Sequence, residues 1–232
     1  MIAAWAFLSL TSRTPILTYH DIIPARTSSS VWFDCTVKEF RDQIAWFKKQ
    51  GAVFVSTNDI YLSRRAGKNL PPKAVCITFA DNYAGFYRYA WPILKRERIP
   101  ATQFVHTAFV GSTIGRPKMT WAQLKELDSS GLITIASQTA THPEDLRKMS
   151  NAKVTAEFLG SKRMLEDKLG HPVNELAYPN GKYDERVANL AKGVGYVIAF
   201  TEDCQPAETA KTSWMVPRYV HTKYRQAWLS KR

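Results

Sequence analysis

The segment from Ala74 to Thr107, AVCITFADNYAGFYRYAWPILKRERIPATQFVHT, decides the fold class of this 232-residue chain. It starts with an apolar, β-rich run at 74–79, continues with a helical pattern at 83–98 and ends in a second β-rich run at 102–107. Short apolar runs rich in β-branched and aromatic residues are typical of buried strands. Strands that alternate with helices indicate a parallel sheet, so this segment predicts an α/β fold.

The same alternation continues on both sides of this unit. The further strands that the pattern predicts are 16–19, 52–56, 132–137, 175–178 and 196–200, and the further helices are 36–50, 121–130, 151–169 and 183–192. Thr36 followed by Glu39 is a capping-box signature at the first of these helices. Glycines that stop helices stand just beyond the predicted ends, at Gly51, Gly131, Gly170 and Gly193. The pattern fits a parallel sheet that is either open or closed into a barrel.

Polar residues directly follow several predicted strands, which favours the barrel. No phosphate-binding loop of the G-x-G-x-x-G or G-x-x-x-x-G-K-[ST] type follows the first strand, so the nucleotide-binding use of an open sheet has no support. In a βα barrel the strand ends converge on one face. We therefore expect a single-domain, distorted (β/α) barrel of seven or eight strands over residues 15–232, with these residues at one end: His20, Asp21, Asp81, Asn82, Gln138, His142 and Asn180.

Composition and charge limit the classes of partner. With 45% hydrophobic and 22% charged residues, the composition is that of a folded globular domain. The 32 Lys and Arg residues exceed the 20 Asp and Glu residues by 12, so the surface favours anionic partners such as anionic envelope polymers. No nucleic-acid-binding motif accompanies this excess, and we expect no nucleic-acid partner.

Residues 1–14 are predicted to be a separate apolar N-terminal segment. Ile2 to Leu10 has the length of a signal-peptide core, but no Lys or Arg precedes it and no A-x-A cleavage site follows. Two interpretations stay open, a remnant of an export signal and the first packed segment of the fold. The run is much shorter than the roughly 20 residues of a transmembrane helix, so we expect no stable membrane span.

An aspartate at one strand end and a Gln-x-x-x-His pair at another are typical of the remains of a metal site. Asp81 supplies a carboxylate, and Gln138 and His142 follow a different predicted strand. Each residue also has an ordinary structural interpretation, because Asp81 can cap a turn or helix and His142 can be a loop residue before Pro143. From residue types alone, both interpretations stay open.

Four segments together resemble a known family. They are ILTYHDI at 16–22, VCITFADNYAGFYRYAWPILKRERIPAT at 75–102, MTWAQLKELDSSGLITIASQTATHPEDL at 119–146 and ELAYPNGKYDERVANLAKGVGY at 175–196. In order and spacing they are similar to the polysaccharide deacetylases, the NodB-homology proteins of carbohydrate esterase family four. The initial TYHD word is most similar to exported poly-β-1,6-N-acetylglucosamine N-deacetylases. The resemblance implies metal-dependent hydrolysis of N-acetyl groups on N-acetylglucosamine polymers by a secreted, periplasmic or cell-envelope protein.

The resemblance assigns roles in two signatures, and this chain departs from both. The family's T-F-D-D-G supplies a general base and then a metal ligand, so Ala80 occupies the base position without a carboxylate and Asp81 keeps the ligand position. The family's S-H-T-x-T-H-P supplies two histidine ligands, of which Gln138 replaces the first and His142 matches the second. Zinc prefers imidazole nitrogen to a neutral amide oxygen. We therefore expect a divalent metal, with zinc as the first choice, to be weakly bound or absent.

Two further segments complete the implied site. The Y-H-D word provides His20 as the catalytic acid, and A-Y-P-N-G at 177–181 provides a groove wall and a backbone N–H for the oxyanion, through Tyr178, Pro179 and Asn180. Aromatic side chains that can stack on sugar rings, with core packing as the alternative for each, are Trp121, Tyr178, Trp214 and Tyr219. The remaining histidines are expected to have structural roles: His106, His171 and His221.

These replacements leave two functions from different classes. A positioned acid or base contributes about 10²- to 10⁴-fold to a rate, so Ala80 predicts a weakened N-deacetylase unless another group substitutes for the base. The alternative is a catalytically inactive carbohydrate-binding homologue that keeps the barrel and its groove. In both cases the expected partner is a polysaccharide that contains N-acetylglucosamine.

Overall fold

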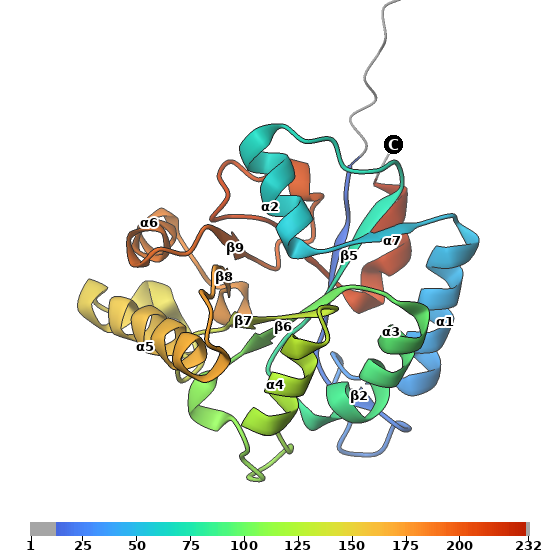
Figure 1. Cartoon of the computed structure of the whole chain (residues 1–232), viewed down its shortest axis with the longest axis horizontal. Coiled ribbons are helices and arrows are strands. Elements are labelled where there is room, and N and C mark those ends of the chain that lie inside the picture. The colour runs from blue at the N-terminus through green and yellow to red at the C-terminus, as the bar shows by residue number, and fades with distance from the viewer. Residues whose placement is uncertain (1–12, 231–232) are drawn as a thin grey trace, which may run out of the picture.

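The computed structural model describes residues 13–230, which form one α/β unit (Figure 1). Most of the predicted apolar segment at 1–14, including Ile2 to Leu10, lies outside the described residues. Within the part of the chain that the structure describes, no helix is long and apolar enough to cross a membrane.

A parallel sheet of eight strands forms the centre of these residues. Its hydrogen-bonded order is β10-β1-β5-β6-β7-β8-β9, and β4 pairs with the first half of β5. The strands are β1 (Ile16–Tyr19), β4 (Val53–Val55), β5 (Ala74–Phe79), β6 (Ala101–Val105), β7 (Ile133–Ser137), β8 (Glu175–Ala177), β9 (Ile198–Phe200) and β10 (Tyr219–Val220). A small separate pair consists of β2 (Ile22–Ile23) and β3 (Cys35–Thr36). All seven strands predicted from the sequence are present, with ends shifted by at most two residues.

The two ends of the sheet are joined, which makes it a distorted barrel. The segment 213–218 hydrogen-bonds to β9, for example through the Val216 N–H to the Ala199 carbonyl at 2.9 Å. It then continues into β10, which pairs with β1 at the other end of the sheet. The prediction of a distorted barrel of seven or eight strands is confirmed.

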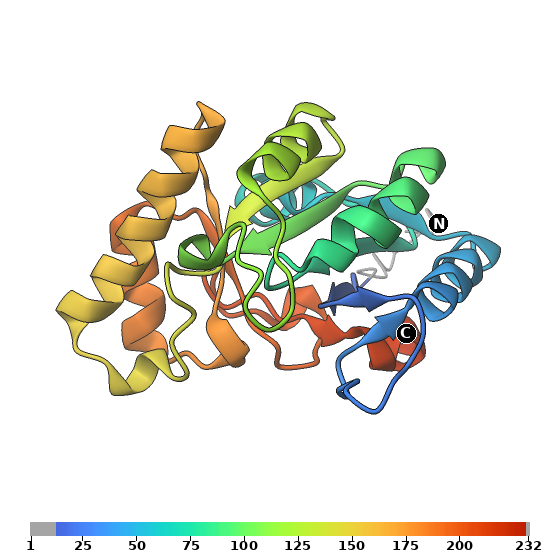
Figure 2. The same ribbon diagram turned by 90° about the horizontal axis from the view of Figure 1, so that it is seen from below.

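Helices lie around the outside of the sheet, with α5 and α6 on one side and α1 and α7 on the other (Figures 1 and 2). They are α1 (Val37–Lys49), α2 (Thr57–Ala66), α3 (Trp91–Glu97), α4 (Trp121–Ser129), α5 (Asn151–Leu169), α6 (Glu185–Val194) and α7 (Tyr224–Leu229). The predicted capping box of Thr36 and Glu39 is present at α1. The sequence pattern missed α2, whose buried residues are only Thr57 and Ile60, and the short α7.

Two helix predictions need correction. The helix predicted at 83–98 is not regular, because Phe86–Ala90 forms a π-helical turn before α3. Pro92 in the first turn of α3 has no N–H to donate, and a wider turn in front of it accommodates the lost hydrogen bond. Gly193 lies inside α6, whose C-cap is Gly195 with φ of 98°. The left-handed conformation that favours glycine occurs two residues later than predicted.

The side chains of β5 point alternately to the two faces of the sheet. They contribute to one core layer outside the sheet and to another inside the barrel. Val75, Ile77 and Phe79 pack with the helices, whereas Ala74 and Cys76 pack with the barrel interior. The other large members of the interior are Ile16, Phe104, Phe200 and Val216. The strands thereby bury both faces and hold their carboxyl ends in fixed positions.

Candidate active site at the strand ends

The polar residues predicted at the strand ends do gather at the carboxyl end of the sheet, and their backbone is unusual. Several non-glycine residues there have a positive φ, which L-residues adopt rarely and which is common at functional sites. The φ values are 69° at Asp81, 41° at Asn82, 69° at Thr139, 55° at His142 and 54° at Asn180. Asn82 stands where the family signature has glycine, and asparagine is one of the few other residues that tolerate this conformation.

Asp81 lies at the centre of the site and contacts both residues of the predicted Gln-x-x-x-His pair. Its Oδ1 lies 3.4 Å from Nε2 of His142. Its backbone N–H donates to Oε1 of Gln138 at 2.8 Å. Asp81 Oδ1 is buried and, among the described residues, has no hydrogen-bond partner. A carboxylate oxygen in that state is suited to accept a ligand that the chain itself does not provide.

These donors do not fit a zinc site that is built from three protein ligands. Asp81 and His142 converge, but the amide oxygen of Gln138 is engaged by the Asp81 N–H. In residues 13–230 no group of three or more His, Cys, Asp and Glu side chains is arranged to hold a metal ion. Catalytic zinc sites use three protein ligands, mostly imidazole and carboxylate, so one ligand of that set is missing. Weak metal binding stays a prediction.

Two basic side chains that the sequence did not predict also contact Asp81. They are Lys118 and His106. Both contact the Asp81 carbonyl oxygen, Lys118 Nζ and His106 Nε2 each at 3.0 Å. Burial lowers the pKa of Lys118 to about 8, although Asp81 and Asp21 oppose the shift. Burial, assisted by the charge of Lys118, lowers the pKa of His106 to about 4, so its ring is neutral at pH 7.

The basic groups around Asp81 set its charge state. Burial alone would raise the pKa of this carboxyl, but the nearby His20, His142, His106 and Lys118 outweigh burial and lower it. Asp81 is therefore ionised at neutral pH. The site combines a buried carboxylate with several hydrogen-bond donors, which suits recognition of a polar, uncharged group.

His20, the predicted acid, also lies near Asp81 and contacts a carboxylate from the end of the barrel. Its Nε2 is 3.9 Å from Oε1 of Glu202. Glu202 also contacts the guanidinium of Arg218 at 3.4 Å. Arg218 is fully buried, donates to the Thr201 carbonyl and lies over the Phe104 ring. This Arg218–Glu202 pair fixes a carboxylate next to the His20 ring.

The position of the catalytic base in the family signature carries no acidic or basic side chain in this protein. Ala80 is fully buried, and its N–H donates to the Tyr19 carbonyl at 2.8 Å. Asn82 beside it is also buried, and neither atom of its side-chain amide has a hydrogen-bond partner among the described residues. Neither residue contributes a group that can accept a proton from water at neutral pH.

The predicted groove wall is only partly correct. Tyr178 and Pro179 are buried in the core, and the Tyr178 hydroxyl donates to the Trp214 carbonyl, so a sugar ring cannot stack on Tyr178. Tyr219 is likewise buried. Trp121 and Trp214 are half-buried against the core clusters. Asn180 alone of its segment is exposed at the strand-end face, and its side chain donates to the Glu144 carbonyl.

Comparison with known proteins finds the same family that the sequence motifs resemble. A model of the polysaccharide deacetylase family matches residues 67–199. YxkH of Bacillus subtilis is 29% identical over 202 residues, which cover 87% of this chain and 68% of the relative. A Staphylococcus aureus poly-beta-1,6-N-acetyl-D-glucosamine N-deacetylase is 25% identical over 197 residues, which cover 81% of this chain and 68% of the enzyme.

Solved structures show the same fold at lower sequence identity. The deacetylase PplD of Streptococcus pyogenes superposes with a TM-score of 0.84 at 24% identity, over 95% of this chain and 98% of PplD. IcaB of Ammonifex degensii superposes with a TM-score of 0.81 at 24% identity, over 95% of this chain and 97% of IcaB. The curled parallel sheet is thus shared over nearly the whole described chain.

Proposed function

This chain belongs to the polysaccharide deacetylase family, and on that basis we propose that it binds N-acetylglucosamine polymers at the strand-end site while hydrolysing their N-acetyl groups slowly or not at all. The observation that carries the proposal is the pair of replacements at the centre of the site. Ala80 offers no base, and Gln138 uses its amide oxygen on the Asp81 N–H. Loss of a base alone corresponds to about 10²- to 10⁴-fold in rate.

The remaining groups support binding of an acetamido group. Such a group offers one carbonyl acceptor and one N–H donor. The ionised Asp81 can accept the N–H, because its buried Oδ1 has no hydrogen-bond partner within residues 13–230. Lys118, His20 and His142 can donate to the carbonyl from the same face. Buried polar groups of this kind gain most when a ligand satisfies them.

The second candidate function is slow N-deacetylation, and the arrangement of three residues favours it. Asp81 and His142 remain 3.4 Å apart, and His20 remains beside them with its Glu202 partner. His20 would then protonate the departing amine, and the oxyanion N–H would come from Asn180. This mechanism needs a substitute for the base, and none of the described side chains at the Ala80 position provides it.

The names of the relatives support a proposal for the polymer that this protein binds. The Staphylococcus aureus relatives are named for poly-β-1,6-N-acetylglucosamine, so we take a β-1,6-linked polymer as the first ligand to test. We propose that the protein is secreted or acts in the cell envelope. The net charge of +12 favours association with anionic envelope polymers there.

Calorimetric titration with a β-1,6-linked N-acetylglucosamine pentamer tests the proposal. We expect a Kd between tens of micromolar and millimolar, as for shallow sites with few burying contacts. The de-N-acetylated pentamer should bind more weakly, because it lacks the acetamido group. His142→Ala should reduce affinity, whereas His171→Ala, an exposed histidine paired with Asp128, serves as the control and should leave it unchanged.

Acetate release and metal content, measured on the same preparations, separate the two candidates. The binding function predicts no acetate above background, with or without added zinc, nickel or cobalt. Acetate release that depends on added metal would favour the slow deacetylase. Absence of both heat and chemical-shift change at millimolar pentamer would exclude the proposed ligand.

A further inference from the structure

Two loops at the carboxyl end of the sheet expose apolar side chains that the site does not use. The segment 24–34, between β2 and β3, exposes Val31 and Trp32, and the segment 106–118, after β6, exposes Phe109 and Ile114. Trp32 at 66% exposure and Phe109 at 40% are the exposed Phe, Trp or Tyr side chains of the described part of the chain. Exposed apolar surface that gathers in one place can mark an interaction site, and Trp32 contributes the largest ring to it.

Trp32 is connected to the site through a single aromatic ring. Its indole meets Phe33 edge-on, with ring centroids 5.6 Å apart and an interplanar angle of 82°. Phe33 in turn packs on the His20 ring at 4.8 Å. One ring, that of Phe33, therefore separates Trp32 from the predicted acid, a spacing that the next sugar residue of a bound polymer can span.

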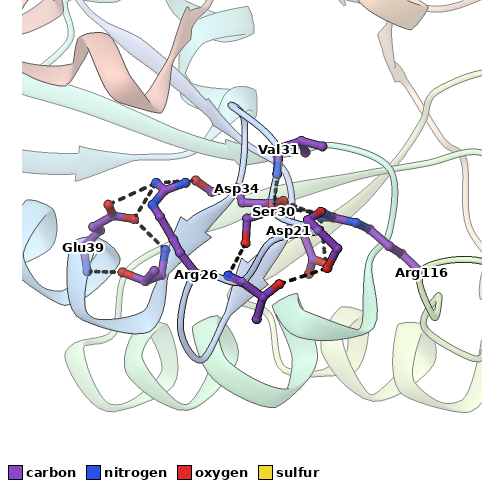
Figure 3. Close-up of polar contacts among 10 residues, drawn as sticks. Asp21, Arg26, Ser30, Val31, Asp34, Glu39 and Arg116 are labelled. Atoms are coloured by element: carbon purple, nitrogen blue, oxygen red, sulfur yellow. Dashed lines mark hydrogen bonds and ion pairs between the residues drawn. The ribbon is translucent and has the colours of Figure 1, made fainter.

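Asp34 holds the segment that carries Trp32 in a defined shape (Figure 3). The Asp34 side chain is fully buried and accepts hydrogen bonds from both terminal guanidinium nitrogens of Arg116. The distance from Nη2 is 2.9 Å. It also accepts the N–H of Val31 at 2.7 Å. The same Arg116 donates to the Ser29 carbonyl at 3.2 Å and to Asp21 at 3.4 Å. Two loops that are far apart in the sequence are thereby linked on both sides of Trp32.

A second clamp fixes the other side of the segment. Arg26 donates to the Asp34 carbonyl at 3.1 Å and to both carboxylate oxygens of Glu39 at 3.0 and 3.1 Å (Figure 3). Glu39 belongs to the capping box of α1 and so ties the segment to a rigid helix. The backbone that carries Trp32 is thus ordered before any ligand arrives, which lowers the entropic cost of binding.

We propose that Trp32 is a sugar-stacking platform that binds a pyranose ring of the glycan next to the one at the strand-end site. This inference rests on the proposed function and adds a residue outside the family signatures. A pyranose has an apolar C–H face and a polar rim. The exposed indole of Trp32 offers an apolar face, and the exposed Ser28 and Ser29 of the same segment offer hydroxyl groups near it. One large exposed ring with nearby hydroxyl groups suits a sugar better than a protein interface, whose core is a broad apolar patch.

The test is pentamer titration of four proteins: wild type, Trp32→Ala, Trp32→Phe and Leu229→Ala. We expect Trp32→Ala to weaken binding by about three- to tenfold and Trp32→Phe to restore most of the loss. Leu229, which is 60% exposed on α7, is the matched control and should leave affinity unchanged. The change in tryptophan emission on binding should disappear in Trp32→Phe.

Each outcome separates this inference from the proposed function. If wild type binds and Trp32→Ala binds equally well, the platform is wrong and the proposed function stands. If wild type does not bind, both are wrong. Arg116→Gln should weaken binding as much as Trp32→Ala, and the double variant should lose no more than either. If Trp32→Ala leaves glycan binding intact but dissociates a dimer in sedimentation, the surface is a contact between copies and the inference is overturned.

Discussion

Asp34 and Asp81 are two buried carboxylates on the same side of the molecule, and they have opposite surroundings. Both oxygens of Asp34 are bound by Arg116 or by the Val31 N–H, and its pKa is lowered because these contacts outweigh burial. Asp81 has a lowered pKa as well. However, its Oδ1 has no hydrogen-bond partner in the described chain, and its backbone has a φ of 69°.

The difference indicates what each carboxylate is for. A fully satisfied carboxylate on ordinary backbone stabilises the folded chain, whereas an unsatisfied one on strained backbone lowers stability. Buried ring nitrogens that lack a partner within residues 13–230 lie around Asp81 as well, at His20 and His106. Departures from local rules that cluster in one place indicate a functional site. The hydrogen bonds around Asp34 therefore stabilise the loop, and the surroundings of Asp81 have the features of a candidate ligand site.

The largest expected effect comes from repairing the site around Asp81. Gln138→His adds an imidazole donor four residues before His142 and should raise zinc affinity, measured by calorimetry. Ala80→Asp alone should change acetate release little. The double replacement should raise acetate release by about 10²-fold or more and exceed the product of the single effects, because the two residues act as one unit.

The matched control for the repair is Ala80→Asn with Gln138→His, which has the same size but no base. It should bind zinc like the repaired protein and remain inactive. A repaired protein that folds and binds zinc yet releases no acetate would show that the loss extends beyond these two positions, and the slow-deacetylase candidate would then be dropped.

The second largest effect concerns the hydrogen bonds between Asp34 and Arg116 and not the site around Asp81. Asp34→Ala leaves Arg116 without its main partner and should lower the free energy of unfolding by about 3 kcal/mol, measured by urea denaturation at pH 7. Asp42→Ala removes an exposed ion pair with Lys38 and should leave the free energy of unfolding nearly unchanged. Equal effects of the two variants would show that the Asp34 network does not support the loop.

The pH dependence of the Asp34 contribution has a defined sign. Its pKa is lower in the folded chain than in the unfolded chain, so its stabilisation is present above the unfolded pKa of about 3.9. The contribution is lost as the pH falls through the folded pKa. The difference between wild type and Asp34→Ala should therefore shrink in acid and stay constant from pH 6 to 8.

Much of the fold was predictable, because strands and capped helices leave local signals. The continuous apolar run of β5 and the capping box of α1 are recognisable in a few adjacent residues. The core of the site was also predictable, since Asp81, Gln138 and His142 belong to short signatures. Their meeting at one strand end follows from the parallel topology.

Other parts of the site could not be predicted, because topology alone brings them together. Arg218 and Glu202 reach His20 from the last strands of the barrel, and Lys118 reaches Asp81 from a loop. No spacing rule links such positions. The wrong prediction for Tyr178 has a related cause, since a tyrosine after a strand can point to a groove or to the core, and the sequence does not distinguish the two directions.

The smallest expected effect concerns a third buried carboxyl group, that of Glu175, which can be compared with Asp34 and Asp81. It begins β8 at the opposite end of the barrel, is buried, and has an Oε2 without a hydrogen-bond partner among residues 13–230. Burial raises its pKa to about 7, although a contact with Thr57 opposes the shift. The folded chain thus prefers the neutral form. Stability is highest below the unfolded pKa of about 4.3 and falls as the pH rises to about 7.

Glu175→Gln removes this titration and should stabilise the protein by about 2 kcal/mol at pH 8, with almost no effect at pH 4.5. Urea denaturation at both pH values measures the difference, and Glu144→Gln, which changes an 89% exposed side chain, is the control with no expected effect. Stabilisation of the same size at both pH values would mean that Glu175 does not titrate in this range. Because Glu175 lies far from the strained backbone around Asp81, its replacement should also leave pentamer affinity unchanged. An unsatisfied carboxylate then marks a ligand site only where backbone strain and neighbouring donors accompany it, as they do at Asp81 and do not at Glu175.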